Sequence, residues 1–230
     1  MGTSRFTQLG GVAGLTFAGL WLIGAIAYLM QVGTPASMPT LAEFTELLRS
    51  QGYSYTLLAR FLAILFVVPF ALAARDYLLG LAPGRARTGA AFLFLYATLW
   101  FVWHATMVAS LGVARSDPLD ETTLTVFLTL VGTLGSAMFW AIAVFQAAWG
   151  AALVTRKGLE QVAGSAFLVG AAAAAIYAIV PDSSYQLGQI MNQLSTLALI
   201  VAVGILGLMM VRGTPRPIKE ALAAPQRQTA

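Results

Sequence analysis

The sequence contains no cysteine, a single histidine and few charged residues. The absence of cysteine excludes disulfides, thiolate nucleophiles, zinc–thiolate sites and iron–sulfur clusters. Only 10% of the 230 residues are charged and 59% are apolar, whereas a soluble domain carries roughly a quarter charged residues. Water is therefore the wrong solvent for most of this chain, and the composition indicates an integral membrane protein.

Six apolar segments are long enough to cross a membrane as helices, because a span needs about 20 mostly apolar residues for a hydrocarbon core of about 30 Å. They lie at residues 10–31, 54–79, 88–114, 123–154, 162–180 and 187–211. These spans and short loops leave no room for a soluble catalytic domain. We expect an all-α membrane bundle of about six transmembrane helices over residues 1–212, followed by a disordered cytoplasmic tail at 213–230.

The charged residues predict how the bundle is oriented. With the amino terminus in the cytoplasm, the cytoplasmic side carries Arg5, Arg75, Arg85, Arg87, Arg156, Lys157, Arg212, Arg216, Lys219 and Arg227. Only Arg49 and Arg115 then remain in external loops. The positive-inside rule therefore places both termini in the cytoplasm. Because the cations lie between apolar runs and form no single stripe, the net charge of +4 indicates orientation and not nucleic-acid binding.

The loop between the first two spans is expected to contain a short external amphipathic helix near residues 41–50. Thr40 and Glu43 match the capping-box pattern, and Gly52 follows as a stop signal. Apolar residues recur at helical spacing, namely Leu41, Phe44, Leu47 and Leu48. This helix either shields the loop backbone from lipid or forms a lid over an outward-facing pocket.

Small residues are expected to mark the contacts between helices, because lipid tails are as apolar as leucine and association depends on close packing. The candidate contact residues are the pairs Gly10/Gly14 and Gly132/Ser136, together with Gly164 and Gly170 of the fifth span. The five tryptophans are expected to be structural anchors or lipid-facing residues.

Arg60 and His104 are the ionisable side chains that lie well inside the spans, where charge is costly and often functional. At 1.5 Å per residue, Arg60 lies about 9 Å from the outer end of its helix and His104 about 12 to 15 Å from the outer end of the next. Asn192 and Gln193, with Gln189 above them, fall in the same outer half of the bilayer. The spacing permits one shared polar pocket that opens outward.

Two interpretations of these residues remain open. In the structural one, Arg60 extends to the external interface, His104 donates to a backbone carbonyl, and Asn192 and Gln193 bridge helices. In the functional one, Arg60, His104 and Asn192 form a ligand-binding or translocation pocket. An arginine there suits an anionic or strongly dipolar ligand, because its planar fork pairs with carboxylate or phosphate.

His104 has a third possible role, as an axial ligand to haem or to a chlorophyll-like pigment beside Trp100 and Trp103. With one histidine in the sequence, the second axial ligand would come from Met107, another methionine or another subunit. A bis-histidine haem within one chain is excluded.

The sequence contains no catalytic motif. The stretch Gly135-Ser136-Ala137 lacks the complete Gly-x-Ser-Gly setting of rhomboid proteases, and the sixth span has no histidine to act as base. The zincin, paired-aspartate and P-loop patterns are absent as well. We therefore expect a non-enzyme without a catalytic residue, a metal site or a cofactor.

Two stretches carry a family resemblance. Residues 149–159 read WGAALVTRKGL and are followed by Gly164 and another apolar helix, and residues 10–15 read GGVAGL. In these stretches the chain resembles a domain-of-unknown-function family of small bacterial multi-span membrane proteins. In that group a long helix ends in Gly-x-x-Leu, a basic turn and a glycine-containing start to the next span. The resemblance implies a bacterial inner-membrane location and brings no activity or catalytic residue.

The first functional hypothesis is a non-enzymatic multi-pass inner-membrane protein that binds a small molecule or lipid from the external side, or that supports a larger assembly. The alternative is a small permease that uses the Arg60 pocket and oligomerises to enclose a path, and a pigment- or haem-binding subunit is a more distant option. The expected partners are the lipid bilayer and either further copies of the chain or other subunits of a membrane complex, with no nucleic acid.

Overall fold

The computed structural model describes residues 5–32, 39–180 and 184–213, which fold into seven α-helices without a strand. The helices are α1 (Arg5–Val32), α2 (Leu41–Arg49), α3 (Gln51–Leu79), α4 (Pro83–Ala114), α5 (Glu121–Leu153), α6 (Leu159–Ile179) and α7 (Tyr185–Arg212). Each of them except α2 is long and apolar enough to cross a membrane, so the predicted all-α fold with six spans is confirmed. The expected tail lies, after Gly213, outside the described residues.

All six long helices begin before the apolar segments that predict them. α1 and α4 differ most, since they begin at Arg5 and Pro83, in polar sequence ahead of the apolar runs. Pro83 suits the first position of a helix, because a backbone N–H at this position would have no acceptor within the helix and proline has no N–H. A helix continues into the headgroup region because its hydrogen bonds do not depend on an apolar surrounding, and hydropathy therefore underestimates its length.

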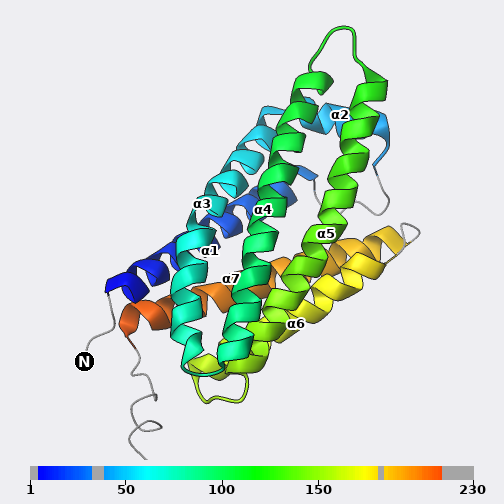
Figure 1. The fold of residues 1–230 in the computed structure, drawn as a ribbon. Coiled ribbons are helices and arrows are strands. Elements are labelled where there is room, and N and C mark those ends of the chain that lie inside the picture. The colour runs from blue at the N-terminus through cyan, green and yellow to red at the C-terminus, as the bar shows by residue number, and fades with distance from the viewer. Residues whose placement is uncertain (1–4, 33–38, 181–183, 214–230) are drawn as a thin grey trace, which may run out of the picture.

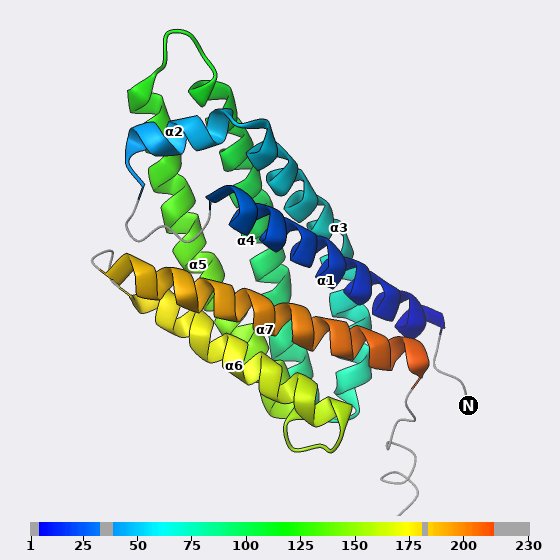
Figure 2. The same cartoon turned by 180° about the vertical axis from the view of Figure 1, so that it is seen from behind.

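The six long helices form a closed ring. Each packs against the next along the chain, in the order α1, α3, α4, α5, α6 and α7, and α7 packs against α1. Figure 1 shows the start of α1, the end of α7 and the α3–α4 and α5–α6 turns at one end of the bundle, which we call the terminal end. At the opposite end, the α2 end, α4 and α5 extend beyond the other helices and α2 lies across them (Figure 2).

Aromatic side chains fill the inside of the ring. Trp149 is fully buried and meets Phe70 and Phe145 edge-on, with ring centroids 5.9 and 5.7 Å apart. Such edge-to-face pairs are favoured by the aromatic quadrupole. Trp21 and Trp100 are also buried, so the expectation that the tryptophans serve as anchors or face lipid is wrong for these three. They are large apolar side chains that pack the core.

The glycines of α1 and α6 lie at close helix contacts, as the sequence predicts. A Cβ on Gly10 would lie 2.0 Å from the Cβ of Ala73, and a Cβ on Gly164 would lie 2.4 Å from the backbone nitrogen of Val154. The pair Gly132/Ser136 behaves differently, because both residues are exposed and nothing lies within 4 Å of a Cβ on Gly132. The prediction that this pair makes a helix contact is therefore wrong within the chain.

α2 is a capped helix that packs on the bundle. The hydroxyl of Thr40 accepts from the Glu43 N–H at 3.3 Å, and the Glu43 carboxylate accepts from the Thr40 N–H at 2.8 Å. Leu48 is fully buried in one cluster with residues of α3, α4 and α5, including Tyr53 and Leu124. α2 therefore covers three of the spans at the α2 end.

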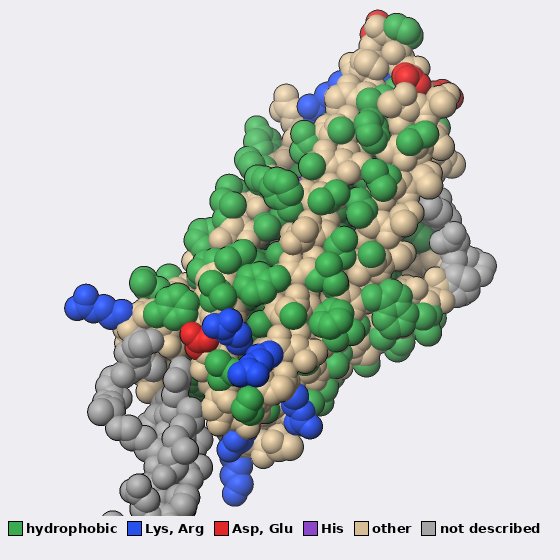
Figure 3. Space-filling view, in the orientation of Figure 1, with side chains coloured by type: hydrophobic (Ala, Val, Ile, Leu, Met, Phe, Trp, Pro, Cys, Tyr) green, Lys and Arg blue, Asp and Glu red, His purple; other side chains and the backbone are tan. Residues whose placement is uncertain are grey.

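The surface has the polarity that a membrane requires. Hydrophobic side chains cover much of the flank of the bundle (Figure 3). Most of the visible Lys and Arg lie towards the terminal end, with a few at the α2 end, and the visible Asp and Glu lie towards the two ends. Exposed leucine and isoleucine side chains that would be costly in water, such as Leu65, Ile23 and Leu197, meet lipid at no cost. The chain is a multi-pass membrane protein by its fold.

Candidate functional site

Arg60 lies on α3 with its side chain against α1. A Cβ on Gly24 of α1 would lie 2.8 Å from the Cγ of Arg60 and 3.5 Å from its Nε, so the arginine passes α1 where a glycine leaves room. The ring centroid of Tyr28 lies 5.0 Å from the guanidinium carbon, which is a cation–π contact. Tyr28 follows Gly24 by one helical turn, and the side chain of Arg60 therefore extends along α1 towards the α2 end.

The guanidinium of Arg60 is poorly compensated. Its Nε is shielded from solvent and has no hydrogen-bond partner, although the residue as a whole is partly exposed. Within the described ranges, one salt bridge is present, between Arg75 and Asp76 at the terminal end. No carboxylate in these ranges pairs with Arg60. The shielded part of the guanidinium loses hydration that no anion replaces. The Nε of Arg60 is therefore a donor without an acceptor.

Two further tyrosines lie near Arg60, in addition to Tyr28. Tyr28, Tyr53 and Tyr96 lie within electrostatic range of the guanidinium, and Tyr53 and Tyr96 are buried. Sequence reasoning missed them, although a signal is present: Tyr53 precedes Arg60 by two helical turns, which places both on one face of α3. Together with Gly24, the tyrosines define what we call the Arg60 site, which lies between α1, α3 and α4.

His104 uses both ring nitrogens within its own helix. The Trp100 indole N–H donates to Nε2 at 3.2 Å, and Nδ1 lies 3.0 Å from the Trp100 carbonyl oxygen. The neutral ring with its proton on Nδ1 satisfies both contacts. His104 is 1% exposed, and its Nε2 lone pair is engaged. This geometry matches the structural interpretation of His104 and leaves no free nitrogen for a macrocycle.

The predicted polar residues come together only in part. His104 lies within electrostatic range of Arg60, and the ring of Phe61 beside Arg60 lies 6.2 Å from the imidazole. Asn192, Gln193 and Gln189 lie on α7, which packs between α6 and α1. Each is partly exposed, and within the described ranges none forms a hydrogen bond with Arg60 or His104. The described contacts therefore join Arg60 to aromatic residues and not to these amides.

α2 is fastened over the Arg60 site by two reciprocal hydrogen bonds. Arg49, at the end of α2, donates from Nε to the Ala114 carbonyl at the end of α4, at 2.6 Å. Arg115, just after α4, donates from Nη2 to the Leu48 carbonyl near the end of α2 at 3.4 Å and to Ser54 Oγ at 2.8 Å. Each arginine thus caps the carboxyl end of the other helix. This explains two cations at the end that is otherwise rich in acids.

Two further buried polar groups escaped sequence reasoning. Gln146 on α5 is fully buried against Gly170 of α6, and both atoms of its amide lack a hydrogen-bond partner. The hydroxyl of Ser195 on α7 is likewise unpaired. Unsatisfied buried groups cost about 1–3 kcal/mol each. Gln146 could have been noticed as the lone side-chain amide of its span.

A shallow hollow of about 350 Å³ lies on the first half of α5, between Thr125 and Thr133. The hydroxyls of Thr125, Thr129 and Thr133 each donate to the carbonyl one turn earlier, at 2.8, 2.9 and 3.0 Å. No charged side chain lines the hollow. It therefore offers little to orient a ligand.

No protein-family model, curated protein or solved structure matches the chain. Within the described residues, no group of three or more His, Asp or Glu side chains could hold a metal ion. The Arg60 site offers a cation with one unpaired donor, together with aromatic faces and phenol hydroxyls.

Proposed function

We propose that this chain is a non-enzymatic membrane protein that binds an anionic or strongly dipolar ligand at the Arg60 site, reached from the α2 end. The observation that supports the proposal most is the shielded, unbonded Nε of Arg60. The first hypothesis from the sequence, a small-molecule or lipid-binding protein, is retained in this form. A bacterial inner-membrane location with the α2 end outside is part of the proposal.

The energetic balance supports a missing acceptor. The cation–π contact with Tyr28 contributes about 0.5–2 kcal/mol, but it offers no acceptor to the shielded Nε of Arg60. A carboxylate or phosphate would supply the opposite charge and bidentate acceptors for the planar fork. The aromatic rings of Tyr28 and Tyr53 would contact the apolar part of the same ligand.

α2 would act as the lid of this site. It covers Tyr53 through Leu48, and Arg49 and Arg115 hold it to α4. These bonds are a few contacts to backbone carbonyls that water can replace, so that opening costs little compared with separating two spans. The permease alternative draws less support, because aromatic side chains fill the ring of a single chain and a path would need further copies.

Arg60→Met tests the proposal. Without ligand we expect this variant to be as stable as the natural protein or more stable, because a charged side chain with a shielded, unpaired donor is replaced by an apolar chain of similar length. Acetate and inorganic phosphate, used as probe anions, should raise the melting temperature of the natural protein in neutral detergent. They should leave that of Arg60→Met unchanged.

Leu58→Ala is the matched control, since Leu58 lies on the same helix and is 52% exposed. It should retain the anion-dependent shift. Native mass spectrometry of the purified protein should also detect an acidic ligand that is lost from Arg60→Met. If neither probe stabilises the natural protein and no ligand co-purifies, Arg60 is a structural residue and the proposal fails.

A further inference from the structure

Two turns that are far apart in the sequence meet at the terminal end. Arg85, near the start of α4, donates from Nη1 to the Ala151 carbonyl near the end of α5 at 2.5 Å. Close by, the Trp149 indole N–H donates to the Ala86 carbonyl at 3.3 Å. These bonds fasten the start of α4 to the end of α5. The cations of both segments are therefore brought to one face.

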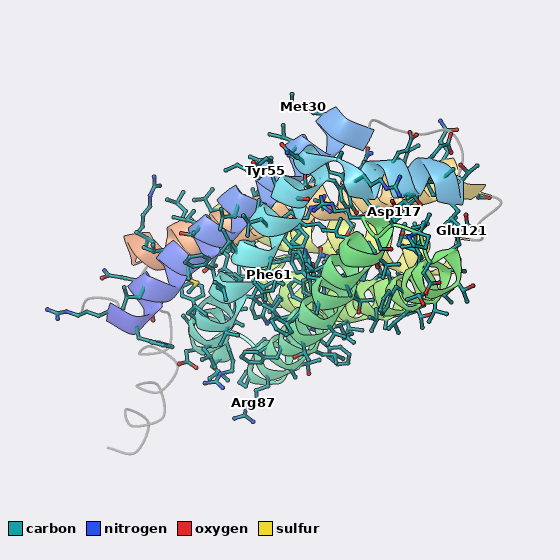
Figure 4. All side chains as sticks on the ribbon, turned by 90° about the horizontal axis from the view of Figure 1, so that it is seen from above. Met30, Tyr55, Phe61, Arg87, Asp117 and Glu121 are labelled. Carbon is teal, nitrogen blue, oxygen red and sulfur yellow. The ribbon has the colours of Figure 1, made fainter. Side chains whose placement is uncertain are left out.

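The resulting face carries four cations: Arg85, Arg87, Arg156 and Lys157. Arg87 and Lys157 are exposed, and Arg87 points away from the bundle when seen from above (Figure 4). Figure 3 shows Lys and Arg side chains gathered at this end of the molecule. We call these four residues the basic face.

The acids near the basic face are engaged elsewhere. Asp76 pairs with Arg75 at 2.8 Å, and the Glu160 carboxylate accepts from the Tyr77 hydroxyl at 3.2 Å. In the part of the chain that the structure describes, none of the four cations has a salt-bridge partner. The face therefore presents uncompensated positive charge to whatever adjoins it.

The basic face lies where the apolar surface of the bundle begins. Leu159 follows Lys157 by two residues and is 46% exposed, and Val162 is 50% exposed. On α4, Leu95 is 46% exposed and lies two turns beyond Arg87. The cations thus sit at headgroup depth, with exposed apolar side chains directly inward of them. A soluble anion would contact only the cations. A phospholipid would contact the cations through its headgroup and the apolar side chains through its acyl chains.

We infer that the basic face binds the phosphate headgroup of an anionic phospholipid, whose acyl chains lie along the exposed apolar residues of α4 and α6. The cations of this face come from both the α3–α4 turn and the α5–α6 turn. One bound lipid would therefore contact both turns and hold α4 and α5 together at this end. This inference does not depend on the Arg60 site, which lies in the other half of the bundle.

The test compares two double variants of the full-length protein in neutral detergent. Arg87→Gln/Lys157→Gln removes two exposed cations of the basic face and leaves Arg85, with its bond to Ala151, in place. Arg5→Gln/Arg212→Gln removes two exposed cations of α1 and α7 at the same end and has the same net charge. Native mass spectrometry measures retention of phosphatidylglycerol and of phosphatidylcholine.

We expect the natural protein to retain phosphatidylglycerol in preference to phosphatidylcholine. The basic-face variant should bind it roughly ten- to thirtyfold more weakly at low salt, because each cation near an anionic lipid is worth about fivefold in affinity. The α1/α7 variant should stay close to the natural protein, and excess inorganic phosphate should not displace the lipid.

Three results would overturn the inference. Equal loss in both double variants would mean that net charge alone attracts the lipid. Equal retention of the two lipids would mean that the cations do not select the headgroup. Displacement by inorganic phosphate would assign the face to a soluble anion. Circular dichroism confirms that each variant is folded before its lipid binding is compared.

Discussion

At single positions in the spans, the size of one side chain decides how closely two helices approach. Gly164 of α6 faces the backbone at the end of α5, where an added Cβ would lie 2.4 Å from the Val154 nitrogen and 2.8 Å from the Leu153 carbonyl carbon. Backbone atoms cannot rotate away as a side chain can. We expect Gly164→Ala to lower the free energy of unfolding by about 1–3 kcal/mol, measured by equilibrium unfolding of the full chain in mixed micelles.

Gly204→Ala is the control for this substitution. Gly204 lies inside α7, and nothing is within 4 Å of a Cβ there, so alanine should be neutral or add up to about 1 kcal/mol through its helix propensity. If Gly164→Ala proved as stable as Gly204→Ala, the inferred close contact between Gly164 of α6 and the end of α5 would be contradicted.

The candidate site was predictable at the level of residue type. Arg60 and His104 stand out because ionisable groups are rare in apolar spans. Their partners were not predictable, since a partner depends on the rotation of two helices about their own axes. His104 binds Trp100 in its own helix, and Arg60 meets Tyr28 from another. For either residue, the sequence spacing is compatible with a partner in the same helix and with a partner in another helix.

At the scale of one element, α2 depends on the ionisation of Glu43. The Thr40 backbone N–H and hydroxyl donate to the Glu43 carboxylate and hold the pKa of Glu43 below its usual value. A lowered pKa in the folded state adds stability above the usual glutamate pKa of about 4.3, and this stability is lost as the pH falls through the lowered value. We expect hydrogen exchange in α2 to accelerate, relative to intrinsic rates, as the pH falls from about 6 to about 3.

Glu43→Gln separates this effect from other caps. The carboxylate of Asp120 caps α5 by accepting from the Thr123 hydroxyl and N–H, which lowers the pKa of Asp120 in the same way. In Glu43→Gln, the protection of the α2 amides from hydrogen exchange should not change with pH. The amides at the start of α5 should still lose protection in acid. Unchanged acid sensitivity of α2 in this variant would rule out the capping box as its cause.

At the scale of the whole molecule, the alternation of loop charge predicts which end faces the cytoplasm. The absence of native cysteine allows single cysteines to report it directly. Ser116 lies in the α4–α5 turn and Thr155 follows α5, and both are exposed. We expect Ser116→Cys to react with a membrane-impermeant maleimide in intact cells, and Thr155→Cys to react only after permeabilisation. The reverse pattern would invert the proposed direction of ligand entry.

The sequence by itself determined the features that a helix settles locally. A helix in lipid satisfies its own backbone and needs only sufficient apolar length, so six spans were predictable without knowing what they pack against. The cap of α2 was predictable for the same reason, because Thr40 and Glu43 are three residues apart. Both features depend on neighbours in the chain.

Tertiary structure alone decided which faces of the helices meet. Gly132 and Ser136 have the same small-residue spacing as Gly10 and Gly14, yet only the α1 pair lies against a neighbouring helix. Trp149 of α5 became a core residue because Phe70 of α3, Ala86 of α4 and Phe167 of α6 pack around it. Arg85 reached Ala151 across 66 positions. The physical reason is that lipid and protein interior are equally apolar. Hydrophobicity therefore does not distinguish the lipid-facing side of a helix from the side that packs on another helix. Which side packs depends on how well surfaces that are distant in the sequence fit together.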